Sequence, residues 1–346
     1  MRVAVVGAGI VGACTAWALV RKGADVTLYE RKQPMAETSR ASSKLLHGGL
    51  RYLETGHVRL VGKSLQARAT WLEQAPHLCE QLQLLLPVYR GVGRPRWAIG
   101  AGIRLYDMLA RGSGFPKGQW MSASEVLARQ PGLAADNLQG AYAFYDAKMD
   151  DEALGQWVVE QFRARGGQLD CGHEVQRLDE LAGFDRIVNA TGPWALALRQ
   201  TQPGAPAYAL DWVRGSHIVL DRPCLAAMLL QVPNDKRIFF VLPRKGQTLV
   251  GTTEVRQETP DNPGPSEAEI DYLLAAHNHY LGPPAQRSDV TEAFAGVRPL
   301  IRSADNPTEA TREWAFERVG KVLHIYGGKW TTAQLQGEDA ATRILQ

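Results

Sequence analysis

Residues 3–12 read Val-Ala-Val-Val-Gly-Ala-Gly-Ile-Val-Gly, and this stretch decides the expected fold. The apolar run before the first glycine is typical of a buried strand, and the apolar pattern over 11–22 predicts a helix that ends at Gly23. A second predicted strand covers 25–29. Strand, helix and strand in this order predict the start of a βαβ unit.

The glycines of this stretch have the spacing G-x-G-x-x-G. Gly7 allows the tight turn, Gly9 lets backbone approach a pyrophosphate, and Gly12 lets helix and strand pack closely. Glu30 ends the second predicted strand, where a carboxylate accepts hydrogen bonds from ribose hydroxyls. The pattern therefore predicts a Rossmann-like dinucleotide site. A carboxylate at Glu30 disfavours NADP, but the motif does not separate NAD from FAD.

Composition places the chain among globular proteins of about two domains, with 346 residues, 45% hydrophobic and 22% charged. A net charge of +3 argues against nucleic-acid binding. The four cysteines are scattered, so we expect no metal site, no disulfide framework and a reducing, cytoplasmic compartment. We also expect no secretory leader, because a buried-strand pattern begins at residue 2, and no apolar run long enough to span a membrane.

Organisation along the chain predicts two interleaved domains. Residues 60–86 are largely helical in pattern, and a helix is expected around 151–165. Short β-rich runs over 212–253 suggest a separate, mixed or antiparallel sheet. Nucleotide-type segments occur at both ends and near residue 190. We therefore assign 1–82, 149–207 and 296–346 to the nucleotide-binding domain, and 83–148 and 208–295 to a smaller substrate domain.

A second informative stretch, residues 42–54, reads Ser-Ser-Lys-Leu-Leu-His-Gly-Gly-Leu-Arg-Tyr-Leu-Glu. Adjacent glycines allow backbone to approach a flat ligand. The Arg-Tyr pair that follows them would face whatever that ligand reacts with. Packing alone does not explain such a mixture of side chains.

Together these segments resemble the FAD-dependent glycerol-3-phosphate dehydrogenases, within the wider superfamily of D-amino-acid-oxidase-like FAD oxidoreductases. The likeness extends over nearly the whole chain, in matching order. Further matching segments are Tyr145-Asp146, Asp150 to Leu154, Asn189 to Trp194, Gly215 to Val219, Asp235 to Phe240, Gly251 to Thr253, Gly296 to Leu300 and Gly327 to Thr332. The resemblance implies an FAD enzyme with an α/β fold.

The resemblance to this family also implies which residues contact the cofactor. The resemblance implies a helix beginning near Thr331, whose N-terminus would stabilise charge on the reduced flavin. We expect non-covalent FAD, although some related amine-oxidising enzymes attach flavin to a histidine near His47. The implied cofactor residues are Gly7, Gly9, Gly12, Glu30, Thr38, Ser39, Ser43, Lys44, Leu45, His47, Gly48, Gly49, Val175, Thr191, Gly192, Trp194, Gly328, Lys329, Trp330, Thr331 and Thr332.

The same resemblance assigns a substrate face with several cations. A phosphomonoester carries almost two charges near pH 7, and arginine forks suit its oxygens. The matched residues are Arg51, Tyr52, Arg298, Arg312 and Lys329. We expect a secondary alcohol to lose a hydride to flavin N5 and a proton to a base. His217 is the preferred base and Lys329 the alternative, and His217 would otherwise orient substrate or flavin.

Alternatives to glycerol-3-phosphate oxidation stay open. A 2-hydroxy-acid or amino-acid oxidase on the same fold would clamp a carboxylate with its Arg-Tyr pair, and a flavin-binding partner protein without turnover is a third hypothesis. The chain ends about one helix beyond Thr332, so we expect a short form without the family's C-terminal helical domain. That expectation leaves the substrate, and the electron acceptor (quinone or another), open.

The composition of residues 89–117 bears on contact with a membrane surface. They hold six cations and one acid, with aromatic and aliphatic residues between them. Such a segment suits the surface of an anionic bilayer, here the cytoplasmic face of an inner membrane. The alternative is a helix packed on the substrate domain with a solvated basic face.

Overall fold

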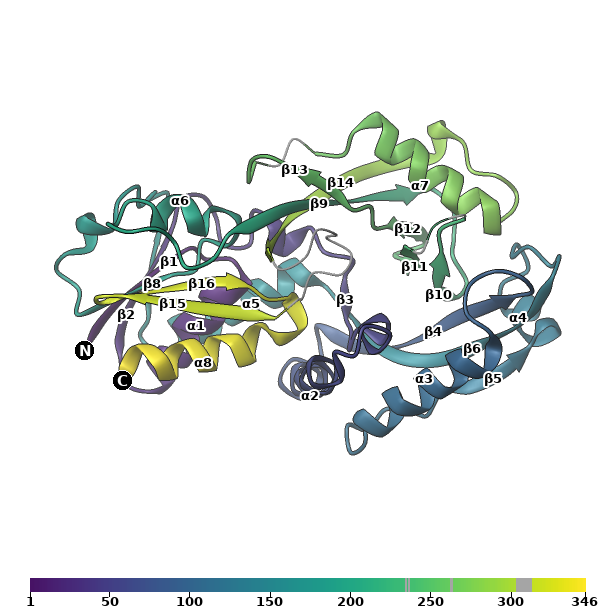
Figure 1. The fold of residues 1–346 in the computed structure, drawn as a ribbon, viewed down its shortest axis with the longest axis horizontal. Coiled ribbons are helices and arrows are strands. Elements are labelled where there is room, and N and C mark those ends of the chain that lie inside the picture. The colour runs from purple at the N-terminus through teal and green to yellow at the C-terminus, as the bar shows by residue number, and fades with distance from the viewer. Residues whose placement is uncertain (234, 236, 262–263, 303–312) are drawn as a thin grey trace.

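In the computed structural model, which describes residues 1–346 apart from 234, 236, 262–263 and 303–312, one layer is a six-stranded sheet of order β15-β16-β8-β1-β2-β7. Its inner strands run parallel, and only β15 is antiparallel. Figure 1 shows these strands next to helices α1, α5 and α8. Their bounds are Arg2–Val6 (β1), Asp25–Glu30 (β2), Gln168–Cys171 (β7), Arg186–Asn189 (β8), Trp314–Val319 (β15) and Val322–Gly327 (β16).

Close packing of α1 (Ile10–Arg21) with α8 (Ala333–Leu345) holds the two chain ends together. A Cβ on Gly337 would come within 2.7 Å of the Cys14 backbone, so this crossing needs glycine. The apolar face of α5 (Asp151–Arg163) joins the same core. The sheet therefore receives a covering layer made from three distant parts of the sequence.

A second sheet of ten strands has the order β13-β9-β12-β11-β10-β4-β6-β3, with β14 on β9 and β5 on β6. Its pairs are antiparallel except that of β10 with β4. The bounds are Leu45–Leu46 (β3), Cys79–Tyr89 (β4), Gln119–Ser122 (β5), Leu138–Met149 (β6), Leu210–Leu220 (β9), Ala227–Gln231 (β10), Ile238–Arg244 (β11), Gln247–Gly251 (β12), Val255–Gln257 (β13) and Val290–Ile301 (β14).

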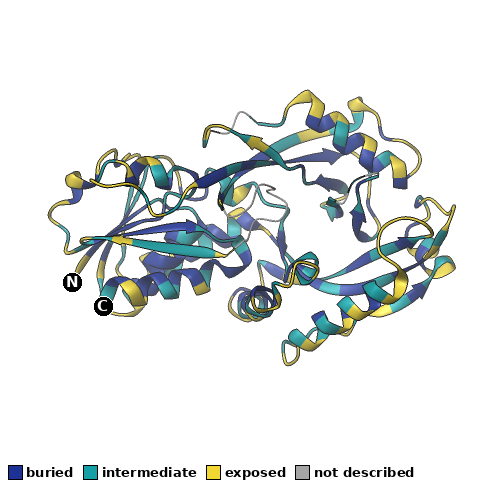
Figure 2. Ribbon diagram, viewed as in Figure 1, coloured by how far each residue is buried: buried dark blue, intermediate teal, exposed yellow. Residues whose placement is uncertain are grey.

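Of the remaining helices, α6 packs on β8 and β16 of the first sheet, and the others cover the second sheet and the junction between the sheets (Figure 1). They are Val58–Gln74 (α2), Arg96–Leu109 (α3), Ala123–Arg129 (α4), Ala195–Arg199 (α6) and Glu267–Tyr280 (α7). Short 3-10 helices occupy Thr38–Arg40, Leu50–Leu53, Leu178–Leu181, Gly192–Trp194, Arg287–Asp289 and Trp330–Thr332. Most strand residues in the middle of both sheets are buried. Along the helices, buried residues alternate with exposed ones (Figure 2).

The predicted α/β class, with a parallel sheet and a separate mixed sheet, is confirmed. The helix expected over 60–86 was wrong beyond Gln74, because β4 begins at Cys79 and pairs along its whole length with β6. Pro76 explains the break, since a residue before proline is driven out of the helical region. The domain boundaries stay a prediction, and β3 at Leu45–Leu46 adds a strand from the first segment to the second sheet.

Candidate active site

A cavity of about 670 Å³ is lined by residues of both sheets, and its size is typical of cofactor sites. Most residues predicted for the cofactor line it. Gly12, Lys44, Gly48 and Thr332 are not among its lining residues. Those that line it are Gly7, Gly9, Glu30, Thr38, Ser39, Ser43, Leu45, His47, Gly49, Val175, Thr191, Gly192, Trp194, Gly328, Lys329, Trp330 and Thr331.

The glycine-rich turn at the end of β1 has the geometry of a phosphate-binding loop. Gly7 has φ +98°, where other residues are strained, and a Cβ on Gly12 would overlap the Gly7 carbonyl oxygen. α1 begins directly at this turn, with Gly9 as N-cap and no acidic residue in the first turn. The helix N-terminus therefore presents a positive end to the cavity.

Glu30 braces this turn as well as lining the cavity. Its Oε2 accepts a hydrogen bond from the Ala8 backbone at 2.8 Å, and its Oε1 accepts one from the Lys32 backbone at 3.0 Å. A carboxylate has further lone pairs, so ribose hydroxyls can still bind it. On the facing side, Asn189 accepts from the Thr191 N–H and hydroxyl, which shapes the loop after β8.

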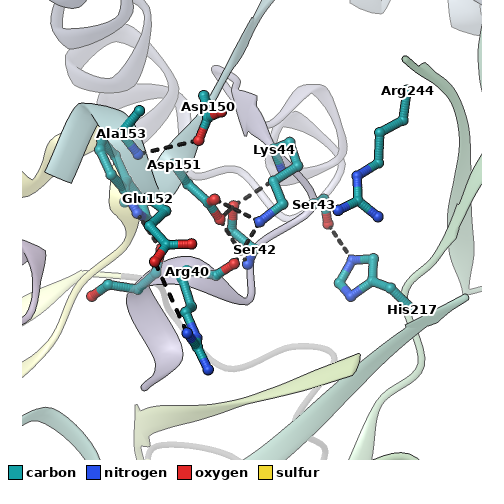
Figure 3. A network of polar contacts seen from close by, with 12 residues as sticks. Arg40, Ser42, Ser43, Lys44, Asp150, Asp151, Glu152, Ala153, His217 and Arg244 are labelled. Atoms are coloured by element: carbon teal, nitrogen blue, oxygen red, sulfur yellow. Dashed lines mark hydrogen bonds and ion pairs between the residues drawn. The ribbon is translucent and has the colours of Figure 1, made fainter. Parts of the chain in front are cut away.

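Polar contacts join the segment from Ser42 to Lys44 to the start of α5, so this segment does more than line the cavity (Figure 3). Lys44 Nζ lies 2.5 Å from Asp151 Oδ1, and Ser42 donates to Asp151 Oδ2 at 2.7 Å from its hydroxyl and at 3.1 Å from its backbone. The side chain of Lys44 thus forms an ion pair with a buried carboxylate instead of lining the cavity. Asp151 was missed as a site residue, although its place in the acidic helix start was a usable signal.

The Gly48–Gly49 turn rests on a buried polar cluster that sequence reasoning also missed. Asp146 Oδ1 accepts from Arg68 Nη1 at 2.6 Å, from the Tyr106 hydroxyl at 2.7 Å and from the Gly48 N–H at 3.2 Å. Burial raises the pKa of Asp146, and the Arg68 guanidinium opposes that rise. An arginine on the apolar face of a predicted helix was the signal for this cluster.

The Gly327-Gly328-Lys329 segment also lines the cavity, and hydrogen bonds join it and the adjacent Thr331 to His47, next to the Gly48–Gly49 turn. Lys329 Nζ donates to the His47 carbonyl at 2.9 Å, and the His47 N–H donates to Thr331 Oγ1 at 3.2 Å. The expected helix start is a 3-10 turn over Trp330–Thr332 that leads into α8. The predicted approach of a helix N-terminus to the cavity is thus present in the structure.

Cationic and apolar side chains line the same cavity. Arg51, Tyr52, Arg298 and Lys329 all line it, and Arg298 Nη2 donates to Thr252 Oγ1 at 2.9 Å. Lys329 Nζ lies 5.4 Å from the centre of the Tyr52 ring. Leu229, Ile238 and Phe240 are among its apolar lining residues, and Glu254 is among its acidic ones. Arg312 lies outside the described residues.

His217, predicted as a base, lies beside the cavity and is not among its lining residues. The ring is 1% exposed, and its Nε2 is 2.9 Å from Ser43 Oγ (Figure 3). Burial lowers the pKa of His217 to about 3, helped by the positive charges of Arg298, Lys44 and Arg244. A buried ring behind Ser43 favours the orienting role over the removal of a substrate proton.

Comparison with known families matches residues 2–342 to the family described as FAD dependent oxidoreductase (DAO). The aerobic glycerol-3-phosphate dehydrogenase of Escherichia coli K12 is 31% identical over 98% of this chain and 72% of that protein. The glycerol-3-phosphate dehydrogenase of Pseudomonas tolaasii is 33% identical over 99% and 71%. The chain spans 63% of the mitochondrial enzyme of Saccharomyces cerevisiae, at 28% identity over 99% of this chain, and about half of mammalian mitochondrial relatives.

Solved structures share the fold. A glycerol-3-phosphate dehydrogenase from Bacillus halodurans, solved in complex with FAD, has a TM-score of 0.78 at 24% identity, over 100% of this chain and 64% of that one. Glycine oxidase from Geobacillus kaustophilus has a TM-score of 0.70 at 20% identity, over 99% and 95%. At these identities the two structures show the architecture alone.

Proposed function

The chain belongs to the DAO family of FAD-dependent oxidoreductases, with glycerol-3-phosphate dehydrogenases among its relatives, and from this premise we propose that it oxidises a small phosphorylated secondary alcohol. The proposed substrate is sn-glycerol-3-phosphate or a close anionic analogue, and the product is the ketone. Quinone or another acceptor would then take up the electrons.

The observation that carries this proposal is a set of three cations that line the same cavity as most of the residues predicted for the cofactor. Arg51, Arg298 and Lys329 line it together. Removing a nearly dianionic phosphate from water requires more than one positive partner. Arginine also binds phosphate oxygens through two N–H groups at once, which orients the substrate as well as holding it.

The residues present fit FAD. Gly7 and Gly9 open α1 for the pyrophosphate, Glu30 offers acceptors for the ribose, and Trp330 and Thr331 line the same cavity. When bound there, FAD supplies the hydride acceptor. The protein's part is to bind the phosphate, orient the carbinol C–H and accept the hydroxyl proton.

A proton acceptor has to lie within reach of the substrate. Lys329, the alternative predicted from the sequence, lines the cavity, and so does His47. An imidazole nitrogen can accept a proton, which suits His47 to this role. We therefore propose His47 or Lys329 as the base in place of the buried His217.

A 2-hydroxy-acid or amino-acid oxidase is the second candidate. Leu229, Ile238 and Phe240 add apolar side chains to the lining of the cavity. An aliphatic side chain would pack there while Arg51 and Tyr52 held a carboxylate. Glycerol-3-phosphate offers little apolar surface, so this lining is the observation in favour of the alternative.

Anaerobic reduction of the bound flavin discriminates these functions. We expect glycerol-3-phosphate to bleach the flavin absorbance of the purified protein, with glycerol as the control that lacks the phosphate. Bleaching only by 2-hydroxy acids or amino acids would support the second candidate. A flavin that none of them reduces would support a non-catalytic flavin-binding protein, and failure to take up FAD would overturn the cofactor assignment.

Membrane contact through α3 is a further part of the proposal. No helix among the described residues is long and apolar enough to cross a bilayer. On α3, however, Trp97 is 75% and Met108 63% exposed, and Arg104 is exposed on the same helix. The ribbon of α3 carries several exposed stretches (Figure 2). Apolar side chains beside cations suit an anionic lipid surface.

We expect the protein to sediment with vesicles that contain anionic lipid. The W97A/M108A double variant should bind them at least about tenfold more weakly, because burying one such side chain is worth roughly 1.5–3 kcal/mol. Leu225→Ala is the matched control, since Leu225 is 66% exposed but lies outside α3. Equal sedimentation of all three proteins would mean that α3 is only a solvated helix.

A further inference from the structure

Ser43 and His217 form a pair that joins two distant parts of the chain at the cavity wall. Ser43 lines the cavity, whereas His217 lies behind it on β9 (Figure 3). Their side chains meet at 2.9 Å between Ser43 Oγ and His217 Nε2. Within the described part of the chain, this is the one hydrogen bond recorded for the Ser43 hydroxyl.

Phe294 and Gly251 restrict the orientation of the His217 ring. It stacks on Phe294 with ring centres 5.0 Å apart and an angle of 12° between the planes. On another side, a Cβ on Gly251 would overlap the imidazole, so only glycine leaves room for it there. The ring therefore holds one orientation, with Nε2 toward Ser43.

The surroundings also select the protonation state of the ring. Lys44 Nζ lies 5.3 Å and the Arg244 guanidinium carbon 5.8 Å from the centre of the Phe294 ring that His217 stacks on. Burial lowers the pKa of His217, and Arg298 and these two cations lower it further, so the imidazole is neutral at working pH. A neutral imidazole carries its single N–H on either Nε2 or Nδ1.

His217 Nδ1 is buried without a hydrogen-bond partner among the described residues. A buried N–H without a partner is rarer in proteins than a buried acceptor without one. The favoured tautomer therefore has its hydrogen on Nε2, which donates to Ser43 Oγ.

We propose that His217 is a positioning residue that donates to Ser43 Oγ and thereby turns the Ser43 hydroxyl hydrogen into the cavity as a donor to an acceptor atom of bound FAD. The serine oxygen is occupied on its buried side by the histidine N–H. Its hydrogen is then directed toward the open side, where the cavity lies. The proposal rests on FAD as the cofactor, not on glycerol-3-phosphate as the substrate.

The absorbance spectrum of bound FAD and the affinity of the protein for FAD test this pairing, and neither measurement needs a substrate to turn over. We expect Ser43→Ala to shift the absorbance spectrum of bound FAD and to weaken its binding roughly three- to tenfold, the value of one neutral hydrogen bond. His217→Leu should produce a shift in the same direction. The S43A/H217L double variant should be no further shifted than Ser43→Ala alone, because both changes remove one interaction.

A conservative variant separates positioning from packing. His217→Gln keeps an N–H donor near the Nε2 position, so we expect it to restore most of the original spectrum and affinity. His277→Leu is the matched control, because His277 is also buried, at 3% exposure, and does not line the cavity. It should leave the spectrum unchanged, and circular dichroism should show that all variants are folded.

Additive effects of the two substitutions, or an unchanged spectrum in His217→Leu, would overturn the proposal. So would loss of the acid limb of the rate–pH profile in His217→Gln with an unchanged spectrum, because that result would make His217 the base. If glycerol-3-phosphate fails to reduce the flavin, only the substrate proposal fails. The spectral comparison needs no substrate and can still be judged.

Discussion

Replacing Arg298 by glutamine is expected to lower kcat/KM for glycerol-3-phosphate by about 100-fold or more while FAD stays bound. Arg298 is a half-buried cation that lines the cavity. Each hydrogen bond to a charged group is worth roughly 1.5–3 kcal/mol, and a guanidinium offers two of them to a phosphate. Arg298→Lys keeps the charge but loses the fork, so its kcat/KM should fall less.

Neighbouring residues hold the Arg298 guanidinium in place, so we expect its replacement to lower kcat/KM strongly. A Cβ on Gly215 would overlap the guanidinium, so glycine makes room for it. Thr252 accepts a hydrogen bond from Arg298, and the neighbouring Thr253 donates to the Glu269 carboxylate at 2.8 Å. Burial would raise the pKa of Glu269, but hydrogen bonds from its neighbours lower it to about 2.

Steady-state kinetics with glycerol-3-phosphate, together with the flavin content of each variant, check this prediction. Arg302→Gln is the matched control, because Arg302 lies on the same segment, pairs with Asp211 and does not line the cavity. Its kcat/KM should stay close to that of the unchanged protein. A loss of less than threefold in Arg298→Gln would show that the phosphate is held elsewhere.

The second large effect is expected on stability. Replacing Arg68 by methionine should lower the free energy of unfolding by roughly 3–5 kcal/mol, because it leaves the Asp146 carboxylate buried without its cation. Both side chains are almost fully buried, at 0% and 5% exposure. The Gly48–Gly49 turn should loosen as well, since the Gly48 N–H also donates to Asp146.

Urea unfolding at two pH values checks the cause. Burial raises the pKa of Asp146 above its unfolded value, so the native state binds the proton first and is favoured as pH falls. The loss in Arg68→Met should therefore be smaller at pH 5 than at pH 8. Arg59→Met, on the exposed face of the same helix, should change stability by less than about 0.5 kcal/mol at either pH.

Replacing both charges by apolar residues provides a further test. The R68M/D146L variant should be more stable than Arg68→Met alone, because it removes the uncompensated carboxylate together with its partner. A loss in the double variant equal to the sum of both single losses would mean that the cluster stabilises by packing and not through its charges.

Much of the fold and of the cofactor site was predictable because their signals are local. Gly7, Gly9 and Gly12 are read from a turn and the helix that follows it, and the structure places Gly7 in a conformation that favours glycine. The helix predicted over 60–86 failed at Pro76, where local periodicity continued although strand pairing with β6 took over. Such pairing joins residues about 60 positions apart, beyond the reach of any periodic pattern.

The sequence by itself determined the α/β class, the dinucleotide site and the family. It also determined the cations Arg51, Arg298 and Lys329, because each lies within a short motif. Only the tertiary structure decided which polar side chains face the cavity and which brace it. His217 meets Ser43 across 174 residues, and Arg68 meets Asp146 across 78. Motifs record the residue types that a site needs, but whether a side chain faces a ligand or supports its neighbour depends on the packing of segments far apart in the chain.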